Sequence, residues 1–114
     1  MTPQGIMDSI TEKNLLLSSK NDELIELVKK KAEAKRNYRQ ARTIKITELR
    51  IDKTPVTLIP ALAKGDKIVS DLCYKSDIAE GVYKACLEKI SDLREQIGSL
   101  RSLLTWMRAE KGLG

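Results

Sequence analysis

The clearest pattern in the chain lies between Val69 and Met107, where the sequence reads VSDLCYKSDIAEGVYKACLEKISDLREQIGSLRSLLTWM. Two sets of positions repeat every seven residues with an offset of three: Val69, Ser76, Tyr83, Ile90, Ile97 and Leu104, and Leu72, Ala79, Cys86, Leu93, Leu100 and Met107. Eleven of these twelve positions hold an apolar residue or Tyr, which is typical of helices that pack in coiled coils. The pattern predicts one long helix over about residues 66–111, and we call the twelve positions the heptad seam.

The first half of the chain also has helical spacing, although its pattern is noisier. Ser9-Ile10-Thr11-Glu12 has the form of a capping box, so the sequence predicts a first helix from about residue 9 to residue 53. This helix should end before Thr54-Pro55, because a proline disfavours helical geometry in the residue that precedes it. A small β-hairpin is the alternative at this end, since apolar residues alternate over 44–51 and β-branched residues follow in 56–59.

The segment between the two helices, residues 54–65, contains two prolines and a glycine and predicts a connector. The sequence therefore predicts an all-α fold, a long antiparallel helical hairpin in a single domain over residues 1–114. A hairpin of two helices buries too little apolar surface to offset the entropy of ordering the chain, so we expect a homo-oligomer, most simply a four-helix dimer. We expect the oligomer core to be formed by Tyr83, Ile90, Leu93, Ile97, Leu100, Leu104, Trp106 and Met107.

The composition of the 114 residues argues against several classes of protein. The chain has no His, which removes Ser-His-Asp and Cys-His arrangements and any metal site with His ligands. No stretch approaches 18 consecutive apolar residues, and the N-terminus has neither the basic cluster nor the apolar run of a signal peptide. We expect no enzymatic activity, no cofactor, no metal, no membrane association and a cytoplasmic location.

The two cysteines, Cys73 and Cys86, are 13 residues apart on the predicted second helix. This spacing corresponds to about 20 Å along a helix, which is beyond the reach of a disulfide. We therefore expect free thiols, with Cys86 in the core, and a bridge between subunits through Cys73 is the alternative.

Positive charge is concentrated in one segment of the first helix. Residues 29–53 carry ten bases and three acids, a net charge of +7, while the whole chain has a net charge of +5. Four bases in this segment recur at spacings of four, four and three, which places them along one side of a helix. We call this set the basic ridge: Lys31, Lys35, Arg39 and Arg42.

The basic ridge has three interpretations at the level of sequence. Its cations could neutralise successive phosphates of a nucleic acid without reading the bases. They could instead pair with the acids of the second helix, Asp77, Glu80, Glu88, Asp92 and Glu95. The third interpretation is a contact with an acidic protein partner.

The stretch from Ile90 to Arg108, ISDLREQIGSLRSLLTWMR, resembles the C-terminal helix of small helical-hairpin proteins of phages and prophages. Leu62-Ala63-Lys64-Gly65-Asp66 and Ala79-Glu80 are similar as well, so the resemblance covers roughly residues 54–111. Such proteins are often found among early genes for recombination and replication. The resemblance implies an accessory role in the cytoplasm of a bacterial host, with no defined activity and no functional residues to transfer.

Together these observations predict a non-enzymatic, oligomeric interaction protein. The first alternative is an accessory protein that binds nucleic acid without sequence specificity through the basic ridge. The second alternative is a small inhibitor that docks on a protein partner through Trp106 or the basic ridge.

Overall fold

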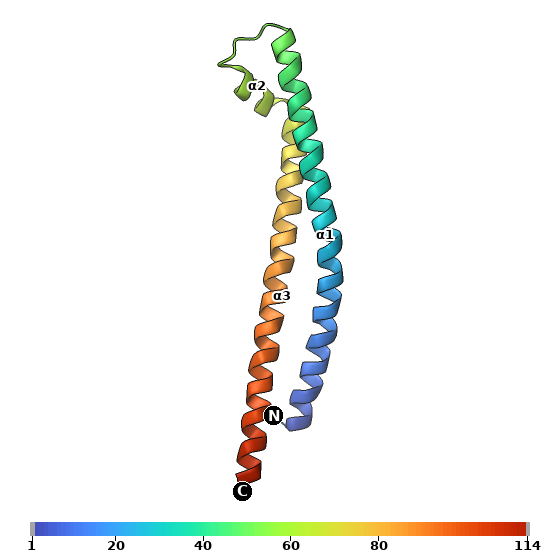
Figure 1. Cartoon of the computed structure of the whole chain (residues 1–114), viewed down its shortest axis with the longest axis vertical. Coiled ribbons are helices and arrows are strands. Elements are labelled where there is room, and N and C mark those ends of the chain that lie inside the picture. The colour runs from blue at the N-terminus through green and yellow to red at the C-terminus, as the bar shows by residue number, and fades with distance from the viewer. Residues whose placement is uncertain (1, 114) are drawn as a thin grey trace. The chain divides into compact units, whose positions relative to one another are not determined.

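The computed structural model describes residues 2–113 and contains three helices. They are α1 (Pro3–Ile51), α2 (Ile59–Gly65) and α3 (Lys67–Leu113), as Figure 1 shows. The described residues contain no strand, so the all-α prediction is confirmed and the alternative β-hairpin is wrong. The apolar residues of 44–51 continue α1, in which Ile46 and Leu49 are half-buried and Ile44 and Ile51 are exposed.

The first helix begins six residues before the predicted start. Thr2 caps it, because Thr2 Oγ1 accepts a hydrogen bond from the amide of Gly5 at 3.0 Å and the Thr2 carbonyl accepts one from Ile6. Pro3 follows at a position where a proline suits a helix, since its missing N–H needs no partner there. The predicted capping box at Ser9 is therefore wrong: Thr2 caps the helix, and Ile6, one turn before Ser9, is already fully buried.

The end of α1 has the hydrogen bonds of a Schellman motif. The amide of Thr54 donates to the carbonyl of Leu49, and the amide of Lys53 donates to the carbonyl of Arg50. Lys53 takes the left-handed conformation that this motif requires, with φ of 58°. The helix thus ends before Thr54-Pro55, as predicted.

The connector contains a helix of its own, which the sequence did not predict. In α2, Ile59 and Ala63 are buried. Asp66 then begins α3: its Oδ2 accepts a hydrogen bond from the amide of Val69 at 3.1 Å, in the manner of an N-cap. The predicted start of the second helix is confirmed within one residue, whereas the helix continues through Gly112 to Leu113.

Contacts divide the chain into two compact units. Unit 1 combines the chain up to Ile25 with the chain from Lys84 onward, and unit 2 comprises residues 26–83. Each unit contains one segment of α1 and one of α3, and the two segments run antiparallel. In unit 1, Lys13 contacts Gln96 and Lys20 contacts Cys86, and in unit 2, Lys31 contacts Tyr83 and Lys45 contacts Asp66. Each unit thus contains an antiparallel pair of helix segments, as the predicted helical hairpin requires, and unit 2 also contains the connector.

The heptad seam of α3 faces inward in both units. All twelve of its positions are buried or half-buried. The buried apolar residues of unit 1 are Ile6, Cys86, Ile90, Leu93, Ile97 and Leu104, whereas those of unit 2 are Ile59, Ala63 and Val69. Cys86 is a free thiol of the core, as predicted, and Cys73 is also free. Within the described chain, no helix has both the length and the apolar composition that a membrane span needs.

Candidate functional site

The residues predicted for an oligomer core lie mostly on the inner face of a single chain. Ile90, Leu93, Ile97 and Leu104 are buried, and Tyr83, Leu100 and Met107 are half-buried. Only Trp106 is mainly exposed, at 61%, and with Pro3, Leu103 and Met107 it lines an open groove in unit 1. The seam therefore serves the packing of α3 on α1, and its role in an oligomer stays a prediction.

Lysines occupy the face of α1 that packs on the heptad seam. Half-buried residues recur on α1 at alternating spacings of three and four, and among them are Lys13, Lys20, Lys31 and Lys45. We call this half-buried face the seam of α1 and these four residues the seam lysines. In unit 1, Lys13 Nζ donates to Gln96 Oε1 at 2.8 Å. A hydrogen bond at 2.9 Å to Glu23, together with the charge of that carboxylate, raises the pKa of Lys20 above its ordinary value.

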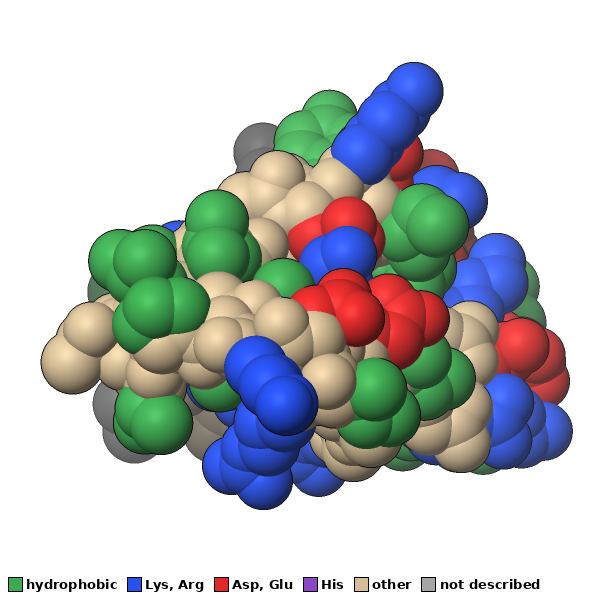
Figure 2. Space-filling model, turned by 90° about the horizontal axis from the view of Figure 1, so that it is seen from above, with side chains coloured by type: hydrophobic (Ala, Val, Ile, Leu, Met, Phe, Trp, Pro, Cys, Tyr) green, Lys and Arg blue, Asp and Glu red, His purple; other side chains and the backbone are tan. Residues whose placement is uncertain are grey.

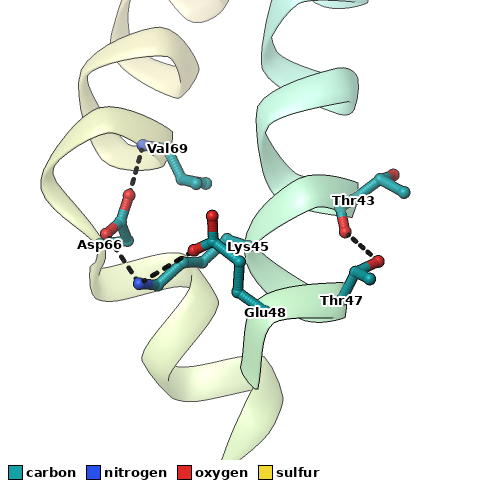
Figure 3. A network of polar contacts seen from close by, with 6 residues as sticks. All are labelled: Thr43, Lys45, Thr47, Glu48, Asp66 and Val69. Atoms are coloured by element: carbon teal, nitrogen blue, oxygen red, sulfur yellow. Dashed lines mark hydrogen bonds and ion pairs between the residues drawn. The ribbon is translucent and has the colours of Figure 1, made fainter. Parts of the chain in front are cut away.

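The two seam lysines of unit 2 have different partners. Lys31 Nζ lies 4.5 Å from the centre of the Tyr83 ring, a cation–π contact. Lys45 Nζ lies 3.6 Å from Asp66 Oδ1 and 3.7 Å from Glu48 Oε2, so one lysine joins α1 to the residue that caps α3 (Figure 3). Unit 2 is therefore held together in part by polar contacts at positions where a coiled coil ordinarily has apolar residues.

The structure divides the basic ridge. Lys31 belongs to the seam, whereas Lys35, Arg39 and Arg42 are exposed. None of these three takes part in an ion pair within residues 2–113. The interpretation that acids of the second helix neutralise them is wrong for this structure, because their side chains lie outside the face that α3 covers.

A groove lies beside the exposed part of the basic ridge, and all three helices contribute to it. Its lining is Tyr38 of α1, Lys64 of α2 and Val69, Ser70, Cys73, Tyr74 and Asp77 of α3. Tyr74 is 67% exposed, while Tyr38 and Cys73 are half-buried. We call this the tyrosine groove.

A second groove of unit 2 has two exposed isoleucines at its edge. Ile44 and Ile68 line it, together with Ala41, Lys45, Glu48, Asp66 and Val69. Ile44 is 60% exposed and Ile68 is 67% exposed. Seen from the connector end, hydrophobic, basic and acidic side chains all reach the surface (Figure 2).

The two grooves belong to opposite edges of the seam. Ile44, Ile68 and Val82 each stand one residue before a seam position, whereas Lys35 and Arg42 each stand one residue after one, following Ala34 and Ala41. In an antiparallel pair of helices, residues that precede an inward-facing position lie on one side of the pair in both helices, and residues that follow one lie on the other side. We call Ile44, Ile68 and Val82 the apolar side of unit 2.

Sequence reasoning missed both the seam lysines and the tyrosine groove. The seam lysines had a signal: Ile10, Leu17 and Leu24 continue at intervals of seven into Lys31, Tyr38 and Lys45. The tyrosine groove had none, because its residues come from three helices whose pairing depends on the conformation of the connector.

The described residues contain no group of three or more His, Cys, Asp or Glu side chains that could hold a metal ion. Comparison of the chain with protein-family models, with curated proteins and with solved structures found no match.

Proposed function

We propose that the chain is a non-enzymatic interaction protein that associates with a second copy of itself through the apolar side of unit 2. The proposal rests on the exposure of Ile44 and Ile68, which are 60% and 67% exposed and line one groove from α1 and α3. Val82 is exposed on the same side of α3, two heptads after Ile68. An accessory role in a bacterial cytoplasm, which the phage resemblance implies, belongs to the same proposal.

A second copy suits this surface because the surface carries charges of both signs. Lys45, Glu48 and Asp66 lie in the groove between the isoleucines. In a two-fold symmetric dimer the same patch faces itself, and because Lys45 pairs with Glu48 and Asp66 of its own chain, the two facing patches bring no unpaired cations together. Burial of the exposed part of each apolar side chain would contribute about 1–2 kcal/mol.

The small core of unit 2 also favours association. Only Ile59, Ala63 and Val69 are buried apolar residues there. Small units with little buried surface commonly gain stability by oligomerisation. A second copy would cover Ile44 and Ile68 and so enlarge this core.

Sedimentation equilibrium over roughly 1–100 µM protein tests the proposal. The wild-type chain is expected to approach twice its mass of 12.8 kDa. The double variant Ile44→Glu/Ile68→Glu should remain a monomer, because the like charges would face each other across the dimer. The matched control Leu15→Glu/Ile25→Glu changes two exposed residues of unit 1 and should dimerise as the wild type does. A monomeric wild-type chain over this range would refute the proposal.

A second candidate function is binding of nucleic acid without sequence specificity, and a separate observation favours it. Lys35, Arg39 and Arg42 are exposed and have no ion pair in the described chain. Exposed cations that have no ion pair can contact phosphates without first breaking an interaction within the protein. Three such contacts predict a slope near −2.7 when the logarithm of the affinity for duplex DNA is plotted against the logarithm of the salt concentration.

Fluorescence anisotropy with a labelled duplex between about 50 and 200 mM salt tests this second function. The variant Lys35→Ala/Arg39→Ala/Arg42→Ala should lose most of the binding and most of the slope. The control Lys30→Ala/Lys67→Ala/Lys75→Ala removes the same charge from other exposed positions of unit 2. Equal losses in both variants would show an effect of net charge alone and would contradict a defined interface.

A further inference from the structure

We infer that the tyrosine groove of unit 2 is a binding site for single-stranded nucleic acid, in which an unpaired base stacks on Tyr74 while Lys35 and Arg42 contact the flanking phosphates. This inference rests on the second candidate function and specifies its ligand. It joins two features of the same side of unit 2, a groove with two aromatic rings and a row of cations without internal partners.

The rings of the groove come from facing helices. Tyr38 belongs to α1 and Tyr74 to α3, and both line the same depression. Tyr74 is 67% exposed, so its ring is available to a ligand in a way that the seam residue Tyr83 is not. Exposed aromatic rings beside cations are the usual platforms for bases of single strands, since every base has a face that can stack.

The cations lie next to these rings because of the helical repeat. Lys35 precedes Tyr38 by three residues and Arg42 follows it by four, so all three occupy one side of α1. Lys35 and Arg42 are about 10 Å apart along the helix axis. This separation suits contacts with two phosphates, one on each side of a base that enters the groove.

The polar groups within the groove suit a base better than a phosphate. Lys64 and Ser70 can donate hydrogen bonds to the ring nitrogens and carbonyl oxygens of a base. Asp77 also lines the groove, and its carboxylate would repel a phosphate but can accept hydrogen bonds from the amino group of a base. Within residues 2–113 this carboxylate takes part in one hydrogen bond, a long one at 3.9 Å from Cys73 Sγ.

The same arrangement favours single strands over a duplex. In a duplex the faces of the bases are covered by their neighbours, so Tyr74 would contribute nothing to binding. Only the contacts of Lys35, Arg39 and Arg42 with phosphates would remain. We therefore expect tighter binding of a single strand, and the difference between the two affinities should depend on Tyr74.

The test measures anisotropy of a labelled 20-nucleotide oligothymidylate and of a duplex of the same length at about 50 mM salt. Tyr74→Ala should weaken single-strand binding by about 5- to 160-fold, the range that corresponds to removal of one stacking ring, and should leave duplex binding unchanged. Tyr74→Phe keeps the ring and should bind within about twofold of the wild type. Lys35→Ala/Arg42→Ala should weaken both ligands, whereas the control Lys30→Ala/Lys75→Ala should weaken neither by a comparable factor.

Three results would overturn the inference. If Tyr74→Ala binds the single strand as the wild type does while Lys35→Ala/Arg42→Ala binds weakly, the interface is correct and the stacking site is wrong. If the wild-type chain binds neither ligand at low salt, the second candidate function fails as well. If polyglutamate displaces the single strand equally well from the wild type and from Tyr74→Ala, the surface recognises acidic protein rather than bases. Circular dichroism confirms that each variant keeps its helices.

Discussion

Unit 1 and unit 2 are built from segments of the same two long helices, yet they bury different numbers of apolar side chains. Unit 1 buries six apolar residues, and five of them come from the heptad seam of α3. Unit 2 buries three, of which Ile59 and Ala63 belong to the short helix α2. Both units have half-buried lysines on α1, but unit 1 adds the buried Ile90, Leu93 and Ile97 of α3. In unit 2 the contacts between the helices include a cation–π contact and an ion pair.

The difference indicates that the two units have different roles, one in stability and the other in interactions. An apolar seam stabilises a hairpin but leaves its flanks without specific chemistry. Polar seam contacts contribute less free energy, and the exposed residues beside them, such as Arg42, Ile44 and Tyr74, remain available for partners. We therefore expect the stability of the protein to depend mainly on unit 1 and its interactions mainly on unit 2.

The largest effect should follow from a cavity in unit 1. Leu93 is 1% exposed, and Leu93→Ala should lower the free energy of unfolding by about 2–5 kcal/mol. Leu87, in the same unit, is 39% exposed, so Leu87→Ala should cost much less and is the matched control. Urea unfolding followed by circular dichroism at one protein concentration measures both, and equal losses would contradict the burial of Leu93 in the core of unit 1.

A smaller effect is expected at the start of α3 in unit 2. Asp66→Ala removes the cap on the amide of Val69 and should lower the free energy of unfolding by about 1–2 kcal/mol. Asp66→Asn keeps a capping oxygen and loses only the charge that faces Lys45, so it should cost less than about 1 kcal/mol. The same urea titration separates the two contributions. If Asp66→Asn were as destabilising as Asp66→Ala, the ion pair rather than the cap would be the main contribution of Asp66.

The cation–π contact of unit 2 should contribute less than the cap. In a double-mutant cycle with Lys31→Ala and Tyr83→Leu, the coupling energy should be about 0.5–1 kcal/mol. Leucine at position 83 keeps an apolar side chain in the seam without an aromatic face. A coupling energy of zero would mean that Lys31 only fills space there, and the contrast between the two units would then rest on the ion pair alone.

The contrast between the units also explains which parts of the structure were predictable from the sequence. The heptad seam of α3 was predicted at all twelve positions because an apolar repeat over five heptads determines which face of the helix packs inward. The first helix was predicted with a wrong start, since Ser9-Ile10-Thr11-Glu12 and Thr2-Pro3 are both good N-terminal signals and the burial of Ile6 favours the earlier one.

The candidate site was predictable only in part. A period of four, four and three placed Lys31, Lys35, Arg39 and Arg42 on one side of a helix, but it could not separate the seam residue Lys31 from its exposed neighbours. That separation depends on the partner helix. The sequence predicted connector residues 54–65 but not α2, whose Lys64 reaches the tyrosine groove, because seven residues are too few for a periodic signal.

The smallest expected effect concerns the turn that begins the connector, and it has the opposite sign. Lys53 adopts a φ of 58°, which costs a residue with a side chain about 1–2 kcal/mol relative to glycine. Glycine also makes the unfolded chain more flexible, which lowers the free energy of unfolding by about 0.4–1 kcal/mol and so offsets part of the gain from relief of strain. Lys53→Gly should therefore raise the free energy of unfolding by about 0.5 kcal/mol.

The neighbouring residue Asp52 provides the control, because it lacks a positive φ. Asp52→Gly brings the flexibility of glycine without relief of strain and should destabilise the protein. Opposite shifts of the urea midpoint in these two variants would show that the Schellman motif is formed in solution as described. A loss of stability in both would instead mean that the Lys53 side chain, at the negative end of α1, stabilises this turn by more than its backbone conformation costs. The connector of unit 2 would then, like its seam, depend on a lysine.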